Sequence, residues 1–209
     1  MPNKLLLIGG GGHCRSVLDS ILLSNLFDEV AIIDHNDCSI AGINTIGNDD
    51  DLSELYKEGW KNAFITVGSV GNTNLRRALY LKVLKIGFNV PSIVDPTAII
   101  SKEASINNGV FVGKRVVINS GALISEGAII NTGSIIEHDC LIGSFSHISP
   151  GAVLCGQVCV GNDSHIGAGS VVRQLIKIGE HTLIGAGSVV VKDIGDYVKA
   201  YGNPCKVVD

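Results

Sequence analysis

The 209-residue sequence has little charge and few aromatic side chains. Charged residues make up 17% of it, and 16 basic against 20 acidic residues give a formal net charge of −4. A nucleic-acid-binding surface needs clustered Lys and Arg, which this balance does not supply. We therefore expect no nucleic-acid partner.

A long apolar run is also missing from the sequence. No stretch approaches the roughly 18 apolar residues of a membrane-spanning helix, so no membrane span is expected. The N-terminal apolar run is Leu5–Ile8, which leads straight into four glycines without the A-x-A site of a secretory signal. These features favour a cytoplasmic location.

The six cysteines include no C-x-x-C pair, which argues against a zinc ribbon. We interpret them as small hydrophobic side chains in a reducing compartment. They are Cys14, Cys38, Cys140, Cys155, Cys159 and Cys205.

The dominant positive feature is a period of six residues. From Val94 to Val190 an Ile, Val or Leu recurs at every sixth residue, seventeen times without an insertion. This period fits neither a helix nor a flat strand, so it predicts a repeat solenoid. A small residue usually stands two positions before each periodic aliphatic, and both point inward. Three hexapeptides then form one triangular coil of eighteen residues.

The outward residues of this solenoid fall into three columns with a spacing of eighteen. One column is aliphatic throughout and consists of Ile99, Val117, Ile135, Val153, Val171 and Val189. An exposed stripe of this length predicts an association surface. We expect it to be buried between subunits of a closed ring, and a three-sided prism favours a homotrimer.

The first 90 residues show different periods. Apolar runs predict strands over 3–8, 29–33 and 63–67, and helical spacing predicts helices over 13–25 and 74–86. This alternation predicts a small parallel, Rossmann-like α/β domain over residues 1–90. The period changes near Val90-Pro91, so residues 91–209 are assigned to the solenoid and a C-terminal tail.

A glycine loop, Gly9–Gly12, follows the first strand and opens the first helix, where phosphate groups commonly bind. The dinucleotide fingerprint G-x-G-x-x-G fails at Cys14, so NAD is not expected. The glycines can also simply close a tight turn. The side chain of Cys14 is expected to narrow the loop.

His138 occupies a solenoid turn beside the aliphatic column. At a subunit seam it can act as a neutral general base, with Asp139, or alternatively Glu137, orienting the ring. The alternative is an exposed turn residue without a role. Gly156 lies one coil further along, and we hypothesise that its backbone N–H faces the same site as His138 and acts there as an oxyanion donor.

His147 lies half a coil from His138 and is expected to stack on His165. This stack can bind a phosphate or form only a polar strip. A hexapeptide carbonic anhydrase would need two histidines five residues apart, and no such pair occurs, so no metal site is expected.

Together, several segments resemble the bacterial sugar acetyltransferases of the sialic acid O-acetyltransferase and UDP-4-amino-sugar N-acetyltransferase family. The resemblance rests on the hexapeptides, the segment around His138-Asp139, Phe145-Ser-His147, the glycine loop with His13, and the closing Gly202-Asn203-Pro204. It implies a left-handed parallel β-helix, acetyl-CoA as donor, trimers and an active site between subunits.

The resemblance also implies roles for individual residues. His138 would take the acceptor's proton, Asp139 would raise the basicity of that imidazole, and His147 would lie near the thioester. The turns that would line the CoA arm are Gly167-Ala168 and Gly185-Ala186. The positions that match contacts to a sugar or nucleotide sugar are Gly11, Gly12, His13, Asp34, His35 and Gly68.

We therefore expect an acetyl-CoA-dependent transferase that acetylates the amine of a nucleotide-linked amino sugar. O-acetylation of a sialic-acid-like sugar is a second reading, because the same imidazole can serve a hydroxyl. A non-catalytic trimeric scaffold that binds a sugar nucleotide is a third.

Overall fold

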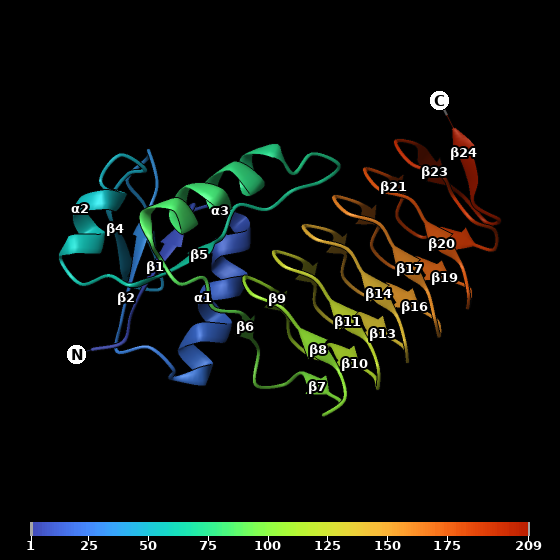
Figure 1. The fold of residues 1–209 in the computed structure, drawn as a ribbon, viewed down its shortest axis with the longest axis horizontal. Coiled ribbons are helices and arrows are strands. Elements are labelled where there is room, and N and C mark those ends of the chain that lie inside the picture. The colour runs from blue at the N-terminus through green and yellow to red at the C-terminus, as the bar shows by residue number, and fades with distance from the viewer. Residues whose placement is uncertain (1, 209) are drawn as a thin grey trace.

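The structure, a computed structural model, describes residues 2–208. Its N-terminal part is an α/β domain and its C-terminal part a triangular solenoid, with the chain ends at opposite ends of the molecule (Figure 1). The central sheet of the α/β domain has the order β3-β4-β2-β1-β5. Its strands are β1 (Lys4–Ile8), β2 (Glu29–Ile33), β3 (Ser39–Ile40), β4 (Ile43–Gly47) and β5 (Asn62–Ile65).

Helices cover both faces of this sheet. Helix α1 (Gly12–Ser24) packs on one face, whereas α2 (Leu52–Lys57) and α3 (Asn74–Ile86) pack on the other. The alternation of side chains along β1 explains the two faces: Leu5 and Leu7 enter the α1 core, and Leu6 and Ile8 enter the α3 core. The expected strands and helices are present, shifted by one or two residues at their ends.

The solenoid consists of short parallel strands on three sides, paired with a spacing of eighteen residues. The six-stranded side carries the aliphatic column. Its strands are β7 (Ile99–Ile100), β10 (Val117–Ile118), β13 (Ile135–Ile136), β16 (Val153–Leu154), β19 (Val171–Val172) and β22 (Val189–Val190). The five-stranded side comprises β8 (Ser105–Ile106), β11 (Leu123–Ile124), β14 (Leu141–Ile142), β17 (Cys159–Val160) and β20 (Lys177–Ile178).

The third, eight-stranded side carries both stacked histidines. Here His147 pairs with His165 in register, as the period predicts. Its strands are β6 (Ile93–Val94), β9 (Phe111–Val112), β12 (Ile129–Ile130), β15 (His147–Ile148), β18 (His165–Ile166), β21 (Leu183–Ile184), β23 (Lys199–Tyr201) and β24 (Lys206–Val208). Inside, the periodic aliphatics form one continuous buried core.

The α/β domain packs against the eight-stranded side. Phe111 and Ile129, whose side chains point outward from the eight-stranded side, enter the core beneath α1. Helix α1 lies between the sheet and the solenoid (Figure 1). Phe145, in the left-handed region at φ 59°, enters the core around α3 and packs edge-to-face on Tyr80. The two parts therefore share hydrophobic cores.

Helix α3 runs along one corner of the solenoid. Arg76 is buried and donates hydrogen bonds to the carbonyl oxygens of Gly127 and Phe145, which belong to successive coils. One coil further on, Asp163 accepts hydrogen bonds from Thr73 and from Arg77, the latter at 2.6 Å. These contacts fix the α/β domain to particular coils.

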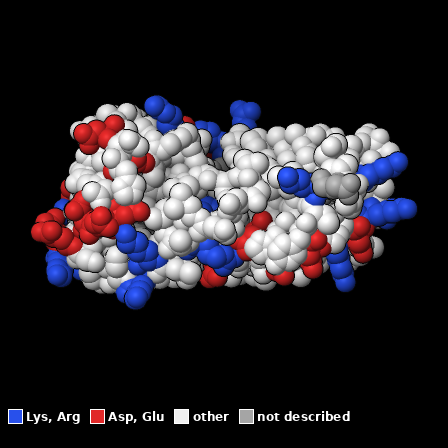
Figure 2. Space-filling view, turned by 90° about the horizontal axis from the view of Figure 1, so that it is seen from above, with Lys and Arg blue, Asp and Glu red and all other residues white. Residues whose placement is uncertain are grey.

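Charge is unevenly distributed over the surface. Acidic side chains gather on the end formed by the α/β domain, and Lys and Arg are scattered, in the view of Figure 2. Among residues 2–208, no helix is both long and apolar enough to cross a membrane.

Candidate functional site

The imidazole of His138 stands on the corner between the six-stranded and five-stranded sides. Its Nδ1 lies 2.9 Å from Oδ2 of Asp139, whose backbone is held in the left-handed region at φ 58° by a hydrogen bond from its N–H to Ser120 O. The other candidate carboxylate, Glu137, contacts the backbone N–H of His138 instead of the ring. Asp139 is therefore the residue that orients this imidazole.

This contact determines the tautomer of neutral His138. A carboxylate oxygen accepts hydrogen bonds, so Nδ1 carries the proton and Nε2 keeps its lone pair. Nε2 has no hydrogen-bond partner within residues 2–208, and the side chain is 56% exposed. The arrangement presents a free basic nitrogen to solvent.

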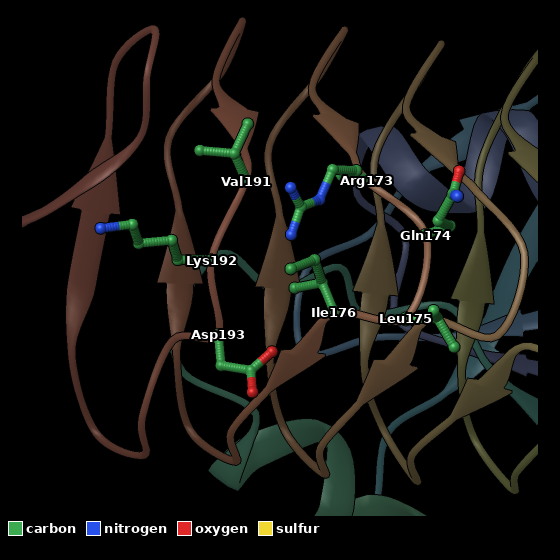
Figure 3. A pocket seen from close by; sticks show the side chains of 7 residues that line it. All are labelled: Arg173, Gln174, Leu175, Ile176, Val191, Lys192 and Asp193. Atoms are coloured by element: carbon green, nitrogen blue, oxygen red, sulfur yellow. The ribbon is translucent and has the colours of Figure 1, made fainter.

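His138 opens onto a hollow of about 230 Å³ along this corner. Its other walls are Gly156, Gln157, Gln174 and Leu175. Gln174 and Leu175 also line an adjoining hollow of about 510 Å³, where Arg173 and Lys192 project from the turns of neighbouring coils (Figure 3). Sequence reasoning missed Gln174, although its spacing of 36 residues from His138 places it on the same corner.

Gly156 lies directly against the ring of His138. A methyl group added here would overlap Nε2 and lie 2.7 Å from Cε1. Its backbone N–H has no acceptor among residues 2–208. A side chain at this position would therefore displace the imidazole, so a Gly156→Pro variant alters the base as well as the N–H.

His147 lies on the eight-stranded side, away from the His138 hollow. Nδ1 contacts the backbone oxygen of Ser69 at 3.0 Å, and Nε2 lies 3.1 Å from the amide nitrogen of Asn131. Nδ1 is thus the donor and Nε2 the acceptor. Burial lowers the pKa of His147 to about 3, despite the hydrogen bond to Ser69. This neutral imidazole joins the solenoid to the loop after β5.

His165 packs edge-to-face on His147, with ring centroids 4.9 Å apart. Its Nε2 lies 3.1 Å from Oγ of Ser149, and burial lowers its pKa. The stack is therefore buried and neutral, which does not suit it to bind a phosphate by charge.

A hollow of about 400 Å³ lies where the start of α1 meets the loop after β5. Gly12, His13 and Gly68 line it, together with Ser69 and His147. Within residues 2–208 neither Nε2 of His13 nor Oγ of Ser69 has a hydrogen-bond partner. Burial, reinforced by the nearby charge of Arg76, lowers the pKa of His13 to about 4.

The glycines at the start of α1 differ in what surrounds them. A side chain on Gly11 or Gly12 would meet nothing within 4 Å, whereas one on Gly9 would lie 2.7 Å from Val67. The open backbone at the helix start is thus free to receive a ligand. The expected narrowing of the loop by Cys14 is wrong, because its side chain is fully buried in the α1 core.

Asp34 and His35 line a separate small hollow of about 140 Å³ at the end of β2. Asp34 accepts hydrogen bonds from the backbone N–H of Gly10 at 2.7 Å and of Asn36 at 2.9 Å, which lower its pKa. The carboxylate therefore holds the glycine loop in place. His35 is exposed, with Nε2 3.9 Å from Asp49.

Gly167-Ala168 and Gly185-Ala186 line a largely apolar hollow of about 430 Å³ that also includes His147 and Val70. Close packing between coils also requires glycine here, because a methyl group on Gly167 would lie 2.5 Å from the carbonyl carbon of Gly185 in the next coil. The two alanines are exposed.

The structure thus divides the candidate residues into two groups. His138, Asp139 and Gly156 lie on the corner that follows the aliphatic side. His147 and the two Gly-Ala turns border the corner that precedes it, next to the sugar-site candidates Gly12, His13 and Gly68. Across residues 2–208, no three His, Cys, Asp or Glu side chains are grouped to hold a metal ion.

Comparison with known proteins identifies both parts of the chain. Residues 4–83 match the PglD N-terminal domain, and residues 139–174 match the bacterial transferase hexapeptide of six repeats. PerB from Caulobacter crescentus, solved with CoA and GDP-perosamine, is 34% identical with a TM-score of 0.94, over 99% of this chain and 98% of PerB.

The acetyltransferase domain of PglB from Neisseria gonorrhoeae, solved with acetyl coenzyme A, is also 34% identical, with a TM-score of 0.94 and complete coverage of both chains. WeeI from Acinetobacter baumannii is 22% identical with a TM-score of 0.87, over 98% of this chain and 99% of WeeI, and shares the fold.

Proposed function

The chain belongs to the hexapeptide-repeat sugar acetyltransferases with a PglD-type N-terminal domain, and we propose that it acetylates the amine of a nucleotide-linked amino sugar with acetyl-CoA. The observation that carries the proposal is the His138–Asp139 pair, which leaves Nε2 free beside an open hollow. The solved relatives with bound acetyl-CoA, or with CoA and GDP-perosamine, support the donor and the class of acceptor.

In the proposed reaction, the lone pair of the neutral sugar amine attacks the thioester carbonyl carbon. Nε2 of His138 takes the proton that the nitrogen gives up. The C–S bond then breaks, and the imidazolium passes the proton to the departing thiolate, so CoA leaves as its free thiol and the base is restored. Asp139 holds the ring and balances the positive charge that the imidazole gains. The unpaired N–H of Gly156 is placed to stabilise the oxyanion that forms on the carbonyl oxygen.

We infer that CoA lies between subunits of a homotrimer. The aliphatic column is half-buried or exposed in the single chain, with Ile99 68% exposed. The His138 corner and the Gly-Ala corner flank this column on opposite sides. Packing the columns around a three-fold axis brings the His138 corner of one subunit to the Gly-Ala corner of the next. Arg173 and Lys192 supply positive charge for CoA phosphates beside the His138 hollow.

For the acceptor, we propose that the nucleotide sugar binds at the start of α1. Gly11, Gly12 and Gly68 expose backbone there, and His13 offers an unpaired nitrogen. Asp34 shapes this loop through Gly10, and His35 borders the adjoining hollow. His147, neutral and fixed by Ser69, links this site to the CoA hollow.

The test is thiol release from acetyl-CoA with UDP-, GDP- and CMP-linked amino sugars and with free sialic acids as acceptors. We expect release only with nucleotide amino sugars, a product heavier by one acetyl group and loss of the free amine. A product acetylated on oxygen would replace the first assignment by O-acetylation. No thiol release with any acceptor would favour the scaffold.

A further inference from the structure

The carboxylate of Asp139 stands against a glycine of the preceding coil. A methyl group added at Gly121 would overlap Oδ1 of Asp139 and lie 3.4 Å from its Cγ. Oδ2 of the same carboxylate contacts Nδ1 of His138. Because the carboxylate is planar, a displacement of Oδ1 also moves Oδ2 away from the imidazole.

The backbone at this corner does not itself require glycine. Gly121 has φ +72°, but the residues at the same corner in the following coils are Asp139, Gln157 and Leu175, with φ 58°, 61° and 65°. Three side chains are therefore accommodated in the left-handed region here. The position that lacks a side chain is the one that faces the carboxylate.

Gly156 faces the imidazole of His138 from the following coil. The pair therefore lies between two glycines, one beside the carboxylate and one beside the ring. Gly156 has a proposed role for its N–H, so a substitution there is ambiguous. A methyl group added at Gly121 would meet only Asp139, overlapping its carboxylate and reaching ordinary contact with its backbone nitrogen at 3.6 Å, so this position tests the arrangement more cleanly.

We propose that Gly121 is a positioning residue, which acts through Asp139 to hold His138 with its proton on Nδ1 and its Nε2 free. The proposal rests on the proposed function for its effect on catalysis. Its effect on the tautomer of His138 is independent of that function.

The main variant is Gly121→Ala, and its matched control is Gly42→Ala. Gly42 has φ +80° in the turn between β3 and β4, away from the proposed sites, and an added methyl group there meets nothing within 4 Å. The control therefore carries a similar backbone strain without a contact to the carboxylate. Both changes are also made in an Asp139→Ala background.

In the otherwise unchanged chain, we expect Gly121→Ala to lower kcat at least tenfold, with KM for acetyl-CoA within about twofold. In the Asp139→Ala background the same change should cost less than twofold, because the group it displaces is absent. Gly42→Ala should stay within about twofold in both backgrounds. An equal loss for Gly121→Ala in both backgrounds, or no loss in either, would overturn the proposal.

Nitrogen-15 NMR of His138 supplies a readout that needs no acetyl transfer. We expect the Nδ1-protonated tautomer in the unchanged chain and in Gly42→Ala, and a shift toward the Nε2-protonated tautomer in Gly121→Ala. Failure of every acceptor to react, with this shift present, would reject the proposed function and retain the positioning role. The same tautomer in all three chains would reject the positioning role.

If Gly121→Ala does not fold, thermal unfolding of the double variant Gly121→Ala/Asp139→Ala decides the matter. Recovery of folding when the carboxylate is removed would show that the collision is with Asp139. A double variant as unstable as the single one would assign the defect to the turn backbone and refute the proposal.

Discussion

Two buried neutral imidazoles make the folded protein sensitive to acid. The pKa of His13 is lowered to about 4 and that of His147 to about 3, mainly by burial. In the unfolded chain both side chains would titrate near 6.5. Between these values the unfolded state binds more protons than the folded state, so stability falls as the pH drops below about 6.5.

The size of the effect follows from proton linkage. At pH 5, an unfolded pKa of about 6.5 against folded values of about 4 and 3 gives a loss of about 2 kcal/mol for each group. We therefore expect the free energy of unfolding to fall by about 4 kcal/mol between pH 7.5 and pH 5. For a typical domain this is a large share of the total stability.

Urea unfolding followed by the fluorescence of Trp60 measures this change. Trp60 is the only tryptophan and lies in the α3 core. The protomer concentration must be fixed, because assembly also contributes to stability. His147→Gln should remove about half of the pH dependence, whereas the exposed His35→Gln serves as control. Equal free energies at the two pH values, or no effect of His147→Gln on the difference, would refute the reasoning.

Three further predictions concern catalysis, assembly and domain packing. His138→Ala should lower kcat by about 10²- to 10⁴-fold with an unchanged unfolding midpoint, since the side chain is largely exposed; near-normal kcat would reject its role as base. Val153→Asp places a charge in the aliphatic column and should convert the proposed trimer into smaller, inactive species in sedimentation experiments, whereas a trimer that persists in this variant would place the interface elsewhere. Phe145→Ala removes a side chain that is 2% exposed and should lower the free energy of unfolding by about 3–5 kcal/mol, against a smaller loss for the half-buried Phe27→Ala. A loss no larger than that of the control would mean that the shared core contributes little.

The solenoid was the most predictable part of the fold because its period repeats seventeen times. Spacing alone assigned the outward residues up to Val189 to the correct side, and the structure pairs Ile135 with Val153 and His147 with His165 as expected. The expected partner of Lys177, Gly195, was wrong, because the spacing shortens to sixteen where Ile178 pairs with Ile194. The sequence did not reveal what covers each side. Phe111 and Ile129 lie beneath α1, a contact between distant segments that no local period encodes.

Short elements without a strong period were missed. Helix α2 has only six residues, and β3 has two, so neither shows enough repeats of an apolar spacing. At the candidate site, His138, Asp139 and Gly156 were named from the sequence, but Gly121 was not. Its closeness to the carboxylate of Asp139 appears only when the two coils are seen beside each other.

The packing of α3 along one corner of the solenoid limits how the distance between sites on the molecule can change. Arg76 and Thr73 contact successive coils, so the proposed nucleotide-sugar site is held at a fixed number of coils from any other site on the solenoid. The distance along the solenoid between that site and a site on another coil cannot change continuously. It changes only when whole eighteen-residue coils, each about 4.8 Å high, are gained or lost between them.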